Sequence, residues 1–135
     1  MKKNISFIIV FTLFTTVCFG DVSTRDNLKR VEDDLRLTIE NLISGEQNIN
    51  KAEILKQLRF DATILEGVIN TTLRDYKTST KSSDRSIQLG YLNVATGYLT
   101  ALASLQEYLE EGKPEVLIRA ISEYSFAKST FSQIK

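Results

Sequence analysis

The chain has 135 residues, with 17 lysines and arginines against 17 aspartates and glutamates, one cysteine and no histidine. This length is typical of one domain, and the balanced charge gives no basic surface of the kind that indicates nucleic acid binding. The lack of histidine excludes histidine-based general base catalysis and histidine metal ligation. A single cysteine excludes an intramolecular disulfide and a cysteine zinc cluster. We therefore expect no metal, no other cofactor and no nucleic acid partner.

The first 20 residues have the pattern of a secretory signal peptide. Lys2 and Lys3 precede an uncharged run over residues 5–17, which is shorter than the roughly 18 residues of a membrane-spanning helix. The small residues Cys18 and Gly20 then lie three and one positions before the polar Asp21, and this pattern predicts cleavage after Gly20. Residues 21–135 would then form a single exported domain, either periplasmic or secreted.

Cys18 leaves a second possibility open for the N-terminal region. Cleavage before Cys18, followed by acylation of its thiol, would tether the domain to a membrane. Val17 is bulkier than the small residue that normally precedes an acylated cysteine. An uncleaved N-terminal anchor is the third possibility. Contact with a membrane is expected only if the chain is lipidated or anchored in this way.

The first two predicted helices have clear start and stop signals. Ser23 begins the first helix, and Gly45 ends it. Asn50 begins the second helix, with Glu53 completing a capping box. The polar run over residues 78–83 then reads as a loop. The predicted buried stripe of the second helix includes Leu58, Leu65, Ile69 and Leu73.

The third predicted helix is capped by Ser83 or Asp84 and stops at Gly112, and Pro114 starts the fourth. Four amphipathic helices with short connections predict an all-α fold, an up-down-up-down antiparallel four-helix bundle. The second and third helices are expected to have about 27 residues each and the other two about 20, so the longer hairpin should overhang by roughly 10 Å.

Gly90 and Gly97 lie in the third helix, seven residues apart. Each glycine costs about 1 kcal/mol in a helix relative to alanine. Their spacing therefore indicates a site where a neighbouring helix approaches closely.

No pattern in the chain indicates catalysis. The acidic run Glu32-Asp33-Asp34 could in principle support acid–base chemistry. Basic residues four positions away, such as Lys29 and Arg30, instead favour a solvated helix face laced with ion pairs. The protein is therefore not expected to be an enzyme.

Apolar residues outside the stripes indicate a binding function. At about 100° per residue, Phe60 and Ile64 point away from the stripe of their own helix, with Val68 one turn further on. Phe126 is nearly opposite the stripe of the fourth helix. These four residues form the predicted protein-binding patch. We expect a protein that works by binding another protein, as an inhibitor, an immunity-type protein or an assembly factor, or that pairs with a second copy of itself.

Two alternative sites remain open. A basic tip between the second and third helices could meet an anionic partner, or it could be a solubilising loop; it carries Arg74, Lys77, Lys81 and Arg85. A carrier or sensor could instead hold a small apolar ligand between the helices, against Tyr91, Tyr98 and Tyr124. A cavity in the core would favour the carrier, whereas a solid core with an apolar outer patch would favour the protein binder.

Overall fold

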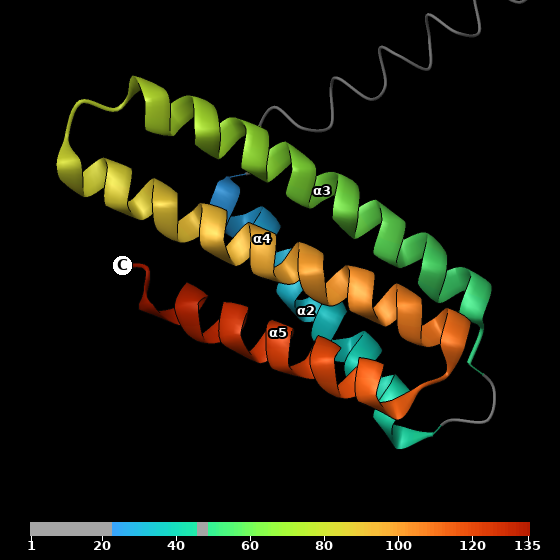
Figure 1. The fold of residues 1–135 in the computed structure, drawn as a ribbon. Helices are drawn as coiled ribbons and strands as arrows, with labels where there is room; N and C mark the ends of the chain where they lie inside the picture. The colour runs from blue at the N-terminus through green and yellow to red at the C-terminus, as the bar shows by residue number, and fades with distance from the viewer. Residues whose placement is uncertain (1–22, 46–48) are drawn as a thin grey trace, which may run out of the picture.

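The computed structural model describes residues 23–45 and 49–135, and these residues are all-α, as predicted. Figure 1 shows the four helices. They are α2 (Thr24–Ser44), α3 (Lys51–Thr78), α4 (Ser82–Glu111) and α5 (Pro114–Gln133). The predicted signal peptide, with Cys18 and Gly20, lies outside the described residues. Within those residues, no helix is both long enough and apolar enough to cross a membrane.

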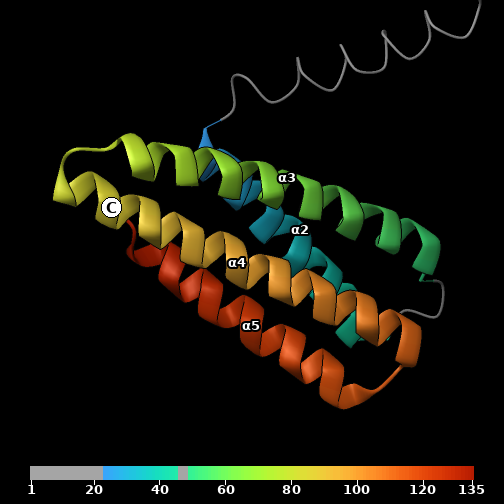
Figure 2. The same cartoon turned by 45° about the horizontal axis from the view of Figure 1, so that its top comes forward.

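The helices alternate in direction, which confirms the up-down-up-down bundle. In Figures 1 and 2, α3, α4 and α5 lie side by side as a layer, and α2 lies across one side of α4. Helix α4 contacts each of the other three helices, whereas α3 and α5 do not contact one another. One side of the layer is therefore covered by α2, and no described part of the chain covers the opposite side of α4.

Most of the predicted boundaries are confirmed. The Asn50 side chain accepts a hydrogen bond from the Glu53 amide at 3.3 Å, and Ser23 caps α2 in the same way. Gly45 and Gly112 follow their helices with φ of 66° and 69°, in the left-handed region that favours glycine. The start of α4 was predicted two or three residues late, because Lys81 takes the cap position without a side-chain hydrogen bond.

The core includes two residues that were predicted to lie outside it. Ile64 and Val68 are each only 2% exposed, so their assignment to an outer row is wrong. The reason is that α3 packs against both α2 and α4, so its buried arc is wider than one stripe. Phe60 and Phe126 are exposed, as predicted.

The two glycines of α4 lie in a close seam between α4 and α5. A Cβ atom built on Gly97 would lie 2.8 Å from the Ala127 Cβ, and one built on Gly90 would lie 3.0 Å from the Ile134 Cδ1. The prediction that a neighbouring helix approaches closely here is confirmed. A side chain at position 97 would push α5 away from α4, whereas one at position 90 would meet only the flexible end of the Ile134 side chain.

The hairpin of α3 and α4 extends beyond the other two helices, as expected from the sequence. Helices α3 and α4 have 28 and 30 residues, against 21 for α2 and 20 for α5. Figure 1 shows their connecting turn beyond the start of α2 and the end of α5. Leu73, which was predicted to be buried, is exposed here together with Leu89, because no third helix covers the tip.

Candidate binding surface

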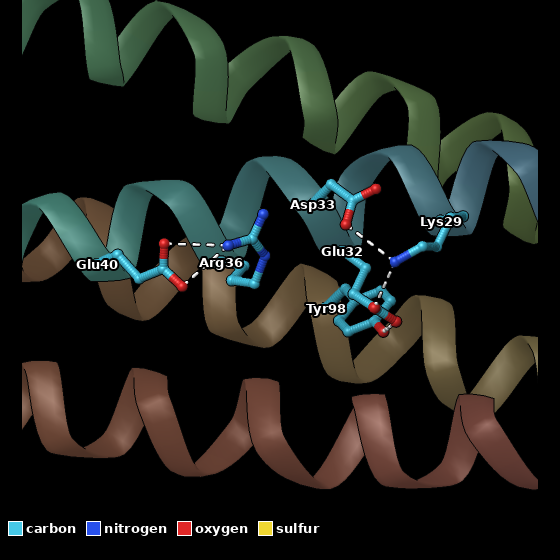
Figure 3. A network of polar contacts seen from close by, with 6 residues as sticks. All are labelled: Lys29, Glu32, Asp33, Arg36, Glu40 and Tyr98. Carbon is cyan, nitrogen blue, oxygen red and sulfur yellow. Dashed lines mark hydrogen bonds and ion pairs between the residues drawn. The ribbon is translucent and has the colours of Figure 1, made fainter.

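A buried polar contact joins α2 to α4 (Figure 3). The Tyr98 hydroxyl donates to Glu32 Oε2 at 2.9 Å, and Lys29 Nζ donates to Glu32 Oε1 at 2.9 Å. Glu32 is only 8% exposed, so its predicted place on a solvated face is wrong. Burial, and then the hydrogen bond to Glu32, raise the pKa of Tyr98 far above its usual range. This contact helps to fix the register of α2 on α4.

Two of the three ion pairs expected between residues four apart on α2 form, Lys29 with Asp33 and Arg30 with Asp34, whereas Arg36 pairs with Glu40 and not with Glu32. Lys29 Nζ also donates to Asp33 Oδ1 at 2.9 Å, and this bond, followed by the one to Glu32, raises the pKa of Lys29. Arg36 pairs with Glu40 at 3.0 Å, one turn further along the same helix (Figure 3). These pairs lie on an exposed face, so they contribute little to stability.

The three tyrosines of the carrier alternative do not surround an open space. Tyr98 and Tyr124 stack, with ring centroids 6.1 Å apart and planes 28° apart. The exposed fraction of Tyr98 is zero, which leaves no space for even a water molecule against its ring. Tyr91 lies in the first third of α4, towards the turn that joins it to α3, and is half-buried. A ligand here would have to displace packed side chains.

The residues of the predicted apolar patch are not brought together. Ile64 and Val68 are in the core, as described above. Phe60 remains 45% exposed on α3, where the Arg30 guanidinium lies 5.0 Å from its ring centroid. Phe126 lies on α5, which does not contact α3. The four residues therefore do not form one continuous surface, although Phe60 and Phe126 remain exposed individually.

The basic tip at the end of the overhanging hairpin is partly engaged in contacts of its own. Arg85 Nε donates to the Ser79 carbonyl at 2.9 Å, and its guanidinium lies 5.7 Å from the Tyr76 ring centroid. Arg74 Nε lies 3.4 Å from Asp75 Oδ1. Lys77 and Lys81 are exposed. Two of the four cations thus stabilise the turn itself.

Phe126 has the largest exposed fraction, 74%, among the large apolar side chains that the structure describes as exposed. Its orientation follows from its neighbours on α5. Ala127 contacts Gly97 of α4, and Lys128 lies over the Tyr124 ring and lines a groove shared with α2. Phe126 is about 200° around the helix from Lys128. It therefore points away from α2, along the uncovered side of the layer.

The uncovered side of α4 carries a regular exposed row, which lies next to Phe126. Tyr98 reaches α2, so Thr96, about 200° away, faces the opposite side. The exposed residues on this side recur at steps of three and four, and they are Leu89, Asn93, Thr96, Thr100 and Ala103. Gly97 contacts Ala127 and Ser104 bonds to Glu123, so Phe126 lies level with the middle of the row. We call this row, together with Phe126, the outer face.

The outer face is uncharged. The sequence from Ser86 to Gln106 contains no aspartate, glutamate, lysine or arginine, although a quarter of the chain is charged. The charges nearest to the row are Arg85, one turn before Leu89, and a group beside the Ala103 end. That group consists of Arg119, Glu107 and Glu123, which are bonded to one another directly or through Ser104. The sequence pattern singles out Phe126, and it also places Leu89 and Ala103 of this row on a second apolar side of the helix. The polar members of the row, Asn93, Thr96 and Thr100, were not predicted.

A second buried acid lies between α2 and α3. Asp61 is 1% exposed, and Gln57 Nε2 donates to it at 3.0 Å and to Asp34 of α2 at 3.2 Å. Burial, and then the charge of Asp34, raise the pKa of Asp61 to about 7. Within the described residues, no three potential metal ligands cluster. The pair of carboxyls is therefore best understood as a local feature of the interface between α2 and α3.

Comparison with known proteins adds no functional assignment. No family model, no curated protein and no solved structure matches this chain. The candidate site therefore depends on the chain's own geometry.

Proposed function

We propose that this protein is exported and acts by binding another protein, without catalysis of its own. An inhibitor, an immunity-type protein and an assembly factor are all roles of this kind. The observation that carries the proposal is the exposed Phe126 ring beside the uncharged row of α4. Aromatic anchors in surroundings depleted of charge are typical of the centres of protein interfaces.

The packing of the core supports binding at the surface over binding inside the bundle. Tyr98 has no exposed surface, and neither do Leu35, Leu65, Val94 and Leu105. A carrier needs a pocket that encloses most of its ligand. The exposed ring of Phe126, in contrast, forgoes roughly 1.5–3 kcal/mol that burial against a partner would return.

Export is tested by the mass of the protein recovered from outside the cytoplasm. We expect the intact mass of a chain that begins at Asp21. A mass that begins at Cys18 with added acyl chains would replace free export with a membrane-tethered protein. The full-length mass would contradict cleavage altogether.

Binding is tested by a photo-crosslinking amino acid placed at position 126 in the full chain and activated in the producing cells. We expect a discrete adduct heavier than the chain itself. The matched control carries the same group at Leu37, which is exposed on α2 on the other side of the molecule. An absence of adducts at position 126, or equal adducts at both positions, would contradict the proposal.

A further inference from the structure

We propose that the outer face of α4 and α5 binds a second copy of this chain, so that two bundles pair through their uncovered layers. This inference depends on the proposed function, since it names the protein that covers Phe126. It requires a surface that can meet itself across a two-fold axis, where residue i contacts residue j and j contacts i.

The first argument is charge. A face that carries a net charge of one sign repels its own copy across a two-fold axis, which is unfavourable. The outer face avoids this penalty, because its exposed residues from Leu89 to Ala103 carry no charge. The outward side of α3, with exposed Lys56, Arg59 and Glu66, has no such property. A foreign partner does not require the absence of charge, whereas a second copy benefits from it directly.

The second argument is shape. The outer face combines one projecting ring, Phe126, with a row of short side chains, Thr96, Thr100 and Ala103, beside it on α4. Short side chains let a second helix approach closely and leave room for a large one. In a two-fold pair, Phe126 of each copy can pack on the short row of the other. The projecting residue and its seat are thus supplied by the same chain.

The third argument is size. The row from Leu89 to Ala103 is about 21 Å long, and two adjacent helices with axes 8–10 Å apart present a face about 20 Å wide, so the outer face measures roughly 400 Å². Two copies would bury about 800 Å² in total, which is below the standard size and in the range of weak, transient interfaces. The pair should therefore be weak and reversible, and its formation should depend strongly on concentration.

The test uses the exported protein and a matched pair of arginine variants. Thr100 and Thr63 are both exposed, and each hydroxyl donates to the carbonyl four residues earlier. Only Thr100 lies on the outer face. By light scattering over a concentration series, we expect the mass to rise from one chain to two. Thr100→Arg should raise the midpoint at least tenfold, and Thr63→Arg should leave it unchanged.

Cysteines placed on the two contacting parts of the outer face give a second readout that does not depend on charge. A mixture of Thr96→Cys chains and Phe126→Cys chains should form a disulfide between two copies under oxidising conditions, because position 126 of one copy faces the row of the other. A mixture of Thr63→Cys chains and Phe126→Cys chains should not. Circular dichroism checks that each variant is folded; if Thr100→Arg is unfolded, Phe126→Ser replaces it and should raise the midpoint in the same way.

Three outcomes would overturn the inference: a single-chain mass at all concentrations, equal effects of Thr63→Arg and Thr100→Arg, or equal crosslinking in both cysteine mixtures. A single-chain mass together with a foreign adduct at position 126 would remove the second copy but keep the proposed function. A single-chain mass with no adduct at all would contradict both.

Discussion

Asp61 is a carboxyl whose ionisation opposes folding. In the unfolded chain its pKa is near 3.8, whereas burial raises it to about 7 in the folded protein. The folded state therefore binds the proton more tightly, and the free energy of unfolding falls as pH rises from about 4 to about 7. Arg30 and Gln57 reduce this penalty, and the charge of Asp34 increases it.

We expect Asp61→Asn to stabilise the protein at pH 8 by roughly 2–4 kcal/mol and to have little effect at pH 4. The asparagine oxygen can still accept the hydrogen bond from Gln57. Urea unfolding of both proteins at several pH values measures the difference. A difference that stays constant between pH 4 and pH 8 would show that Asp61 does not titrate in this range.

Gly97 gives a prediction in which two effects have opposite signs. Helix propensity alone would make Gly97→Ala stabilising by about 1 kcal/mol. The contact with Ala127 instead predicts a loss of roughly 1–3 kcal/mol, because neither methyl group can move without moving a helix. Thermal unfolding decides between them.

The matched control for this prediction is the exchanged pair, Gly97→Ala with Ala127→Gly. Its new methyl group would lie 3.6 Å from the Cα of residue 127, which is an ordinary contact. Most of the lost stability should therefore return. If the single variant is as stable as the parent protein, the seam is looser than the structure indicates.

At the scale of single residues, the sequence predicts caps better than burial. Asn50, Gly45 and Pro114 act through neighbours within a few positions, so the local sequence is sufficient to place them. Glu32 is different, because its burial depends on the Tyr98 hydroxyl, 66 residues away. No local pattern shows which of three adjacent acids turns inward.

At the scale of helices, α3 shows why a single apolar stripe is too simple a description. A helix between two neighbours has two contact directions, so Ile64 faces α2 while Leu65 belongs to the core beside α4. The sequence gives the period of the buried residues, but the width of the buried arc depends on how many helices pack against it. The same argument explains why Phe60 is exposed and Ile64 is not.

We therefore expect single substitutions at these two positions on α3 to behave differently. Ile64→Asp should unfold the protein, because it buries a charge without a partner. Phe60→Asp should leave the protein folded and cost about 0.5–1 kcal/mol through the lost contact with Arg30. Circular dichroism and urea unfolding measure both effects. If Ile64→Asp were tolerated, Ile64 would belong to the surface after all.

At the scale of the whole molecule, the bundle is asymmetric in how it is covered. Helix α2 closes one side of the layer. The other side presents the short, uncharged side chains of α4 and, beside them, Phe126 of α5. The sequence predicts the number, order and direction of the helices, because these follow from turns and chain connectivity. It does not predict which side of α4 stays open, since that depends on where α2 crosses the layer.

The overhang of α3 and α4 also has a kinetic consequence. Residues 73–78 and 82–86 are mostly exposed, so they can open without separating the rest of the bundle. Amide hydrogen exchange should show a gradient along α3, with protection lowest near the turn and highest between residues 58 and 68. Uniform protection would mean that the bundle opens only as a whole. If protection does fall towards the turn, the basic tip is a segment that can change its shape while the core beneath the outer face stays closed.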